Sequence, residues 1–104
     1  MSDRFENVTI LKQANVYYEG KVVSRTVLFP DGSRKTLGFM LPGEYEFGTA
    51  APELMEILAG EMAVLLPAAS DWQTFKAGSS FHIPPDSKFK LILKLPVDYC
   101  CSYG

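Results

Sequence analysis

Apolar and polar side chains alternate along much of this chain with a period of two, which is typical of β-strands that bury one face. The stretch 88–95 is the clearest example, with an apolar face formed by Phe89, Leu91, Leu93 and Leu95. Lysines occupy most of the other face, which is interrupted by one isoleucine. The pattern predicts an amphipathic strand in this stretch.

Glycine and proline divide the chain into short extended segments. The nine or ten predicted strands are drawn from 16–18, 21–29, 34–41, 45–49, 54–58, 62–66, 71–75, 79–83, 88–95 and 99–103, and residues 8–11 are a further edge-strand candidate. The only helical candidate, 52–58, is at most one turn because Ala59-Gly60 follows it directly. This pattern predicts an all-β sandwich or barrel.

The stretch 41–67 organises the predicted sheet. Residues 45–49 alternate as one short strand, and a turn follows at 48–52. Two apolar runs, 54–58 and 62–66, are joined by the small residues Ala59 and Gly60. The pattern predicts a long hairpin bent at these two residues and buried on at least one face.

Length and charge limit the functional classes. The chain has 104 residues, the length of one domain, and 12 acidic against 10 basic side chains give a formal charge of −2. Because there is no excess of lysine and arginine, we expect neither a nucleic-acid nor an anionic-membrane partner. The polar first residues do not resemble a signal peptide, and the adjacent Cys100 and Cys101 are expected to be reduced thiols of a cytosolic protein.

Two spacings resemble the motifs of cupin barrels. Glu53 is followed after six residues by Gly60, and Gly78 is followed after five residues by Pro84. The resemblance implies a single cupin-type jelly-roll β-barrel over residues 15–104, preceded by an N-terminal arm over residues 1–14.

The cupin motif positions predict a site without a metal ion. Counting along the motifs, the usual histidine ligands fall on Phe47, Thr49 and Phe89, which leaves only Glu53 as a ligand. With Tyr45, these side chains would form a partly aromatic pocket suited to a flat, partly polar ligand. The alternative is that the aromatic residues are ordinary core.

Other candidate residues each have a structural alternative. Glu56 is either paired within the fold or aimed at a ligand hydroxyl, and Trp72 with Gln73 is either a stacking platform or core. Lys21 and Arg34 lie on the first predicted hairpin, where solvated surface charge competes with an anion site. The single histidine, His82, has the opposite parity to its apolar neighbours and is expected on the surface or at a dimer contact.

Longer phrases along the chain carry a more specific resemblance. They are NVYYEGKV, DGSRKTLGFMLPGEYEFGTAAPELMEILAGEMAVLLP, DWQTFKAGSSFHIPPDSKFKL and YCCSY. Together they resemble the small single-domain cupins of the pyrimidine/purine nucleoside phosphorylase family, over residues 15–103.

The resemblance implies a bacterial cytoplasmic pentosyltransferase of nucleoside salvage, active as a homodimer. Such an enzyme cleaves purine and pyrimidine nucleosides with inorganic phosphate as co-substrate, and it needs no metal or other cofactor. From the residue types, we expect Arg34, with Lys21 or backbone N–H groups, to bind the phosphate and Glu53 or Glu56 to hold the ribose hydroxyls. Tyr45, Phe47 and Phe89 are expected to enclose the base. Two other classes stay open, a binding protein for a nucleoside or sugar without turnover and a purely structural barrel without a cavity.

Overall fold

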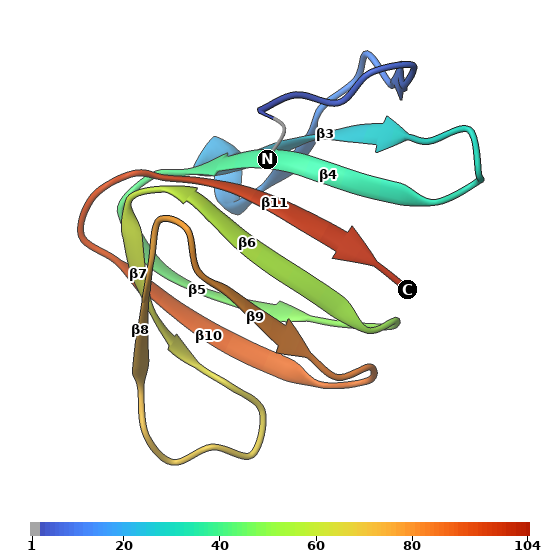
Figure 1. Cartoon of the computed structure of the whole chain (residues 1–104). Helices are drawn as coiled ribbons and strands as arrows, with labels where there is room; N and C mark the ends of the chain where they lie inside the picture. Colours follow the sequence, from blue (N-terminus) through green and yellow to red (C-terminus); the bar gives the residue numbers. More distant parts are fainter. Residues whose placement is uncertain (1–2) are drawn as a thin grey trace.

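The computed structural model describes residues 3–104 as two antiparallel β-sheets packed face to face (Figure 1). Apart from one short 3₁₀ turn, every regular element in this range is a strand. The molecule measures 40 × 30 × 26 Å along its principal axes. The predicted all-β class is confirmed.

Eleven strands and one 3₁₀ helix make up the described part of the chain. They are β1 (Thr9–Ile10), β2 (Asn15–Tyr17), η1 (Tyr18–Gly20), β3 (Val22–Leu28), β4 (Arg34–Met40), β5 (Gly43–Gly48), β6 (Glu53–Ala59), β7 (Glu61–Leu65), β8 (Gln73–Lys76), β9 (Ser80–Ile83), β10 (Lys88–Leu93) and β11 (Val97–Tyr103). The helical candidate of the sequence is therefore mostly strand β6.

The strands are hydrogen-bonded in two separate sheets. The larger sheet has the order β1-β3-β4-β11-β6-β9, with β2 also paired to β3, and the smaller has the order β5-β10-β7-β8. Among residues 3–104 the hydrogen bonds do not close these sheets into one barrel, so the single closed barrel is not observed. The two sheets face each other and enclose the core (Figure 1).

The hydrophobic core follows the predicted alternation. In β10, the side chains of Phe89, Leu91 and Leu93 are buried between the sheets, as the sequence pattern predicted. Leu95, the last residue of the predicted apolar face, is 66% exposed because the strand ends at Leu93. The sequence pattern therefore identified the buried face and overestimated the strand by two residues.

The hairpin of β3 and β4 is confirmed with its predicted turn. Leu28 pairs with Arg34 at the turn end of the two strands. In the turn, Asp31 Oδ1 accepts hydrogen bonds from the Ser33 hydroxyl at 2.6 Å and from the Ser33 backbone N–H at 2.8 Å. These bonds favour the ionised carboxylate and lower the pKa of Asp31.

The predicted hairpin over residues 54–66 is wrong. Its two runs are strands β6 and β7, but β6 pairs with β11 and β9 whereas β7 pairs with β10 and β8. The chain therefore crosses from one sheet to the other at Gly60, which has a φ of +86°. Two apolar runs with a short glycine link have the same sequence pattern whether they turn back within a sheet or pass a corner between sheets.

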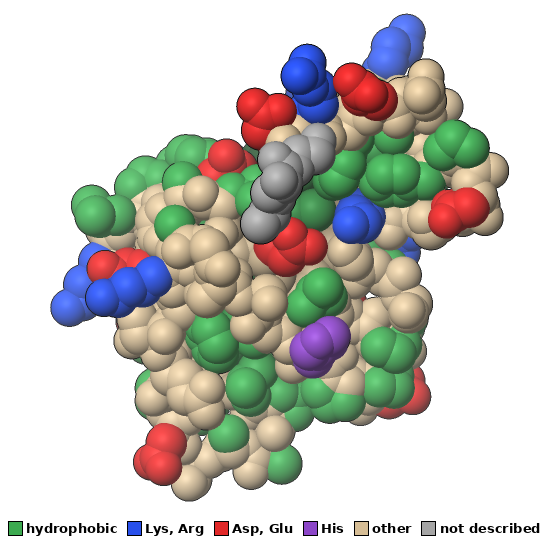
Figure 2. Space-filling model, viewed as in Figure 1, with side chains coloured by type: hydrophobic (Ala, Val, Ile, Leu, Met, Phe, Trp, Pro, Cys, Tyr) green, Lys and Arg blue, Asp and Glu red, His purple; other side chains and the backbone are tan. Residues whose placement is uncertain are grey.

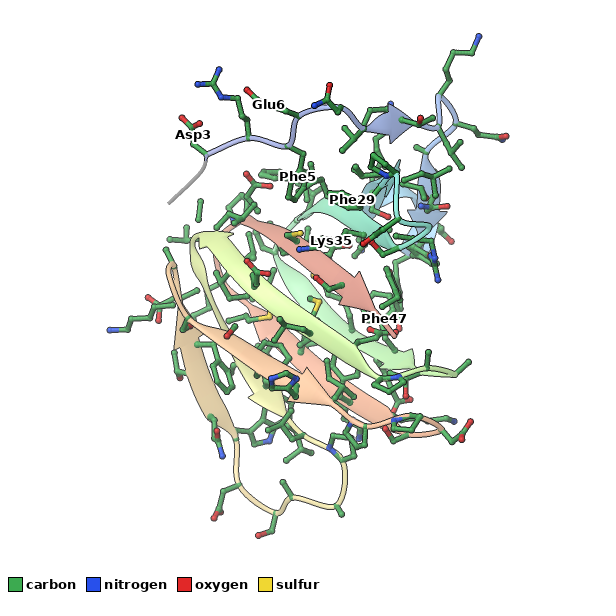
Figure 3. All side chains as sticks on the ribbon, turned by 45° about the vertical axis from the view of Figure 1, so that its right-hand side comes forward. Asp3, Phe5, Glu6, Phe29, Lys35 and Phe47 are labelled. Atoms are coloured by element: carbon green, nitrogen blue, oxygen red, sulfur yellow. The ribbon has the colours of Figure 1, made fainter. Side chains whose placement is uncertain are left out.

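The described part of the N-terminal arm lies along the outer edge of the larger sheet. Strand β1 pairs with β3, and the Phe5 ring packs edge-on against Phe29 with the ring centroids 5.1 Å apart. Lys35 Nζ lies 5.5 Å from the Phe5 centroid. Figure 3 labels these three side chains. Residues 1 and 2 of the predicted arm lie outside the described residues, and the domain boundary at residue 15 stays a prediction.

Gly60→Ala tests the corner between the sheets. A Cβ at this position would lie 2.6 Å from the Pro96 carbonyl oxygen, in addition to the strain of a positive φ. Gly32→Ala is the matched control, because Gly32 has a φ of +89° and nothing within 4 Å of the added Cβ. We expect Gly60→Ala to reduce the free energy of unfolding by about 1–3 kcal/mol more than the control does, measured by urea unfolding. An equal decrease in the free energy of unfolding of the two variants would show that the positive φ alone explains why glycine is needed at position 60.

Candidate functional site

One cavity of about 250 Å³ lies between the two sheets and combines aromatic with ionisable side chains. Its aromatic side is formed by Tyr17 of β2, Phe47 of β5 and Phe89 of β10. Its polar side is formed by residues of β4, β6 and β11, namely Arg34, Glu53, Tyr99, Cys101 and Tyr103. The cavity is therefore amphipathic, a property of sites that bind flat ligands with a polar substituent.

The aromatic side is built by strand pairing. Phe47 and Phe89 are register partners of β5 and β10, and their ring centroids lie 6.1 Å apart. Tyr17 meets the Phe47 ring edge-on, with a centroid distance of 5.8 Å and an interplanar angle of 89°. The three rings form a continuous apolar surface with a corner at Phe47.

Glu53 supplies a half-buried carboxyl group on the polar side. It is the first residue of β6 and pairs in register with Tyr103 of β11. Burial raises the pKa of Glu53, while a hydrogen bond from Cys101 and the positive charge of Arg34 oppose that rise. Burial is the largest of these effects, so the Glu53 carboxyl ionises less readily than an exposed glutamate.

The cysteine beside Glu53 acts as a neutral hydrogen-bond donor. Cys101 Sγ lies 3.4 Å from Glu53 Oε1. Burial and, next, the charge of Glu53 raise the pKa of Cys101 to about 12, so its thiol keeps its proton at neutral pH. Because the thiolate is the nucleophilic form, this arrangement disfavours covalent catalysis by Cys101.

Two tyrosines complete the polar side. Burial raises the pKa of Tyr99 and of Tyr103, so both hydroxyls remain protonated. Tyr99 pairs with Gly38, where a Cβ would overlap the tyrosine ring. The absence of a side chain at Gly38 therefore leaves the space that the Tyr99 ring occupies.

Arg34 lies at the rim of the cavity with its guanidinium over an aromatic ring. Its Cζ is 3.9 Å from the ring centroid of Tyr103, whose hydroxyl shares a 3.1 Å hydrogen bond with Thr36 Oγ1. Within residues 3–104, no carboxylate lies within ion-pair distance of Arg34. The stacked guanidinium therefore keeps N–H donors that no carboxylate occupies, and arginine commonly uses such donors to bind phosphate.

Four of the residues predicted from sequence meet in this cavity: Arg34, Phe47, Glu53 and Phe89. Tyr45 lies in the core beside it and donates a 2.6 Å hydrogen bond to the Leu41 carbonyl. Thr49 donates a 2.7 Å hydrogen bond to the Pro84 carbonyl, which ties the end of β5 to the turn before β10. Neither of these two residues lines the cavity.

The remaining candidates lie farther from the cavity. Glu56 alternates with Met55 and Ile57 and so points to the outer side of β6, next to Cys100. Lys21 and Trp72 border two shallow surface depressions, and Gln73 is exposed on β8. His82 is exposed, as predicted from its parity, and is the purple side chain in Figure 2.

Three tyrosines and one cysteine of the cavity were not predicted from the sequence: Tyr17, Tyr99, Tyr103 and Cys101. The last three share one face of β11 through simple alternation, which is visible in the phrase YCCSY. Alternation alone does not show which face of β11 lines a cavity. The adjacent Cys100 and Cys101 point to opposite faces of the strand, and both are buried. Only the pairing of β11 between β4 and β6 resolves the question.

Within residues 3–104, no three His, Cys, Asp or Glu side chains gather closely enough to hold a metal ion. No helix in this range has the length and apolar character needed to cross a membrane.

Comparison with known proteins relates this chain to a family of enzymes. The family described as pyrimidine/purine nucleoside phosphorylase matches residues 12–103. The chain belongs to this family. A protein of that name from Hydrogenovibrio crunogenus is 64% identical over 100 residues, which is 96% of each chain. Another from Syntrophotalea carbinolica is 62% identical over 99 residues, which is 95% of each chain.

Solved structures show the same architecture. A crystal structure of a protein of unknown function from Acinetobacter sp. ADP1 has a TM-score of 0.96 at 41% identity, and the match covers 99% of this chain and 100% of that one. An RmlC-like cupin from Shewanella frigidimarina has a TM-score of 0.70 at 15% identity, covering 94% and 84% of the two chains. The second similarity concerns the fold alone, and it shows that the two sheets are cupin-like.

Substitutions at Cys101 test the control of Glu53 ionisation. The thiol hydrogen bond favours the ionised carboxylate, so removing it in Cys101→Ala should raise the pKa of Glu53 further. Cys101→Ser keeps a donor in a side chain of similar size and should give a lower pKa than the alanine variant. Carbon-detected NMR titration of the Glu53 carboxyl measures both variants. The same pKa in the two would show that the hydrogen bond has no influence.

Proposed function

We propose that this protein is a metal-independent nucleoside phosphorylase that cleaves purine and pyrimidine nucleosides with inorganic phosphate. The observation that carries the proposal is the amphipathic cavity, in which three aromatic rings face Glu53 and Arg34. A nucleoside has the matching chemistry, a flat base on one end and a polyhydroxylated sugar on the other. The names of the relatives support the same activity.

In the proposed reaction, a phosphate oxygen forms a bond to ribose C1′ as the bond between C1′ and the base nitrogen breaks. The electron pair of that bond leaves with the base, which then takes up a proton. Arg34 binds the phosphate through its free N–H groups and holds it beside the sugar. The Glu53 carboxylate accepts hydrogen bonds from ribose hydroxyls and stabilises the positive charge that develops on the ribose.

The aromatic side of the cavity suits more than one base. Sites that match the hydrogen-bonding groups of a ligand discriminate strongly against other ligands, whereas apolar contact discriminates weakly. Phe47 and Phe89 offer only apolar ring surface to a base. This composition supports acceptance of both purine and pyrimidine nucleosides.

The proposed activity is tested by measuring free base and pentose 1-phosphate released from uridine, cytidine, adenosine, guanosine and inosine. Each nucleoside is incubated with and without phosphate, in the presence of a chelator. We expect release from several nucleosides that requires phosphate and is insensitive to the chelator. Binding of nucleosides without release would instead support the alternative function, a protein that binds nucleosides without turnover.

The same assay tests the role of Arg34. Loss of a charge-assisted hydrogen bond in Arg34→Ala should raise the KM for phosphate about 10-fold or more and change the KM for the nucleoside much less. Arg25→Ala is the matched control, because Arg25 is an exposed arginine on the neighbouring strand β3 and does not line the cavity. An unchanged phosphate KM in Arg34→Ala would remove Arg34 from the phosphate site.

We also propose that the two facing sheets correspond to a cupin-type barrel. We further propose that the protein is a homodimer in the cytoplasm. The outer face of the larger sheet supports this assembly, because Leu37 and Phe39 of β4 and Leu58 of β6 are exposed there. We expect the mass measured by light scattering to be that of two chains and Phe39→Glu to reduce it to one. A single-chain mass for the unmodified protein would contradict the dimer.

A further inference from the structure

A segment with a strained backbone conformation lies next to the aromatic side of the cavity. Tyr18, Glu19 and Gly20, which form η1 between β2 and β3, have positive φ values of 51°, 58° and 95° in succession. Left-handed conformations are unfavourable for residues with a Cβ, and such strain persists only where surrounding contacts fix the backbone. Two adjacent residues of this kind therefore need strong local contacts.

The Tyr18 hydroxyl supplies these contacts by binding the backbone of another sheet. It donates a 2.5 Å hydrogen bond to the Glu46 carbonyl and accepts a 2.8 Å hydrogen bond from the Glu46 N–H. Glu46 belongs to β5, the edge strand of the smaller sheet, whose outer backbone groups have no strand partner among residues 3–104. The Tyr18 ring also packs against Tyr45, with the centroids 4.9 Å apart. We call this set of contacts the Tyr18 clamp.

The clamp connects the two sheets next to the cavity. Strand β2 is paired to β3 of the larger sheet, whereas the clamp binds β5 of the smaller sheet. Tyr17, the residue before the clamp, has an extended backbone with φ −127° and ψ 155°, and its ring lines the cavity against Phe47. Tyr17 is 46% exposed, so a large part of its surface is open to a ligand.

We propose that Tyr17 is a substrate-binding residue that contacts the nucleoside base, and that the Tyr18 clamp is the positioning element that holds it against Phe47. This inference rests on the proposed function and assigns a specific role, contact with the base, to the cavity residue of β2. The ring corner of Tyr17 and Phe47 contacts a flat base on a face and on an edge at once. Because every base has an aromatic face, this contact accepts purines and pyrimidines alike.

The test compares steady-state kinetics of Tyr17→Ala, Tyr17→Phe and Tyr18→Phe with those of the unmodified protein. Loss of a base-stacking ring in Tyr17→Ala should raise the KM for uridine and inosine about 10-fold or more and leave the phosphate KM within about 2-fold. Tyr17→Phe keeps the ring and should restore the nucleoside KM to within about 2-fold. Tyr18→Phe keeps both rings but removes the two hydrogen bonds to Glu46, and should raise the nucleoside KM without raising the phosphate KM.

Val16→Ala is the control on the same strand. Val16 is exposed and does not line the cavity, so its truncation should leave both KM values unchanged. If Tyr17→Ala does not fold, as judged by its circular dichroism spectrum, Tyr17→Leu replaces it, because leucine keeps apolar bulk and lacks the flat ring. Nucleoside KM values unchanged in the folded Tyr17 variant would overturn the inference while the proposed function stands.

Saturation-transfer NMR on nucleosides without phosphate separates this inference from the proposed function. We expect stronger transfer to the base protons than to the ribose protons, and loss of that preference in the Tyr17 variant. If the unmodified protein shows this result but has no phosphorolytic activity, the inference stands and the proposed function fails. Equal transfer to base and ribose protons, or no binding of any nucleoside, would overturn the inference.

Discussion

The pairing of β11 between β4 and β6 is the interaction on which the cavity depends. This last strand of the chain pairs with Gly38 through Tyr99 and with Glu53 through Tyr103, so it joins parts of the chain that are far apart in sequence (Figure 1). Its alternation places Tyr99, Cys101 and Tyr103 on the cavity side. A shift of register by one residue would move all three to the outer side and leave Glu53 without its hydrogen-bond donor. The polar side of the site is therefore a consequence of one strand pairing.

The two charged residues of the site, Glu53 and Arg34, differ in how deeply they are buried. Glu53 is half-buried and loses hydration, which raises its pKa, whereas Arg34 lies at the rim and keeps contact with water. The hydrogen bond from Cys101 and the field of Arg34 offset part of the cost of an ionised Glu53. A polar ligand that donated further hydrogen bonds to this carboxylate would offset more of it. Such incomplete compensation is expected at functional sites, where stability is reduced in favour of binding.

Strand alternation and turn residues predicted most of the fold from the sequence. The hairpin of β3 and β4 and the buried face of β10 follow from local pattern, since each depends on residues near one another in the chain. The sheet to which a strand belongs depends on distant partners, which is why the link at Gly60 was interpreted as a hairpin. Prediction of the site from sequence was limited in the same way, because it also depends on pairing between distant strands. The cupin spacing identified Phe47, Glu53 and Phe89, whereas Tyr17 and Cys101 are brought there by pairings of β2 and β11 that no local pattern specifies.

The two sides of the cavity separate apolar contact from charge within a cupin-like frame. The positions that correspond to imidazole ligands in the resembled motif carry Phe47, Thr49 and Phe89, so that side offers mainly ring surface. Ionisable groups are concentrated on the opposite side, on strands of the larger sheet. In the proposed reaction, positive charge develops on a sugar that lies between these two sides. A carboxylate held in a partly dehydrated cavity acts on that charge more strongly than it would in water. In the proposed reaction, the division between an apolar and a charged side would let one cavity both bind a flat base and stabilise charge.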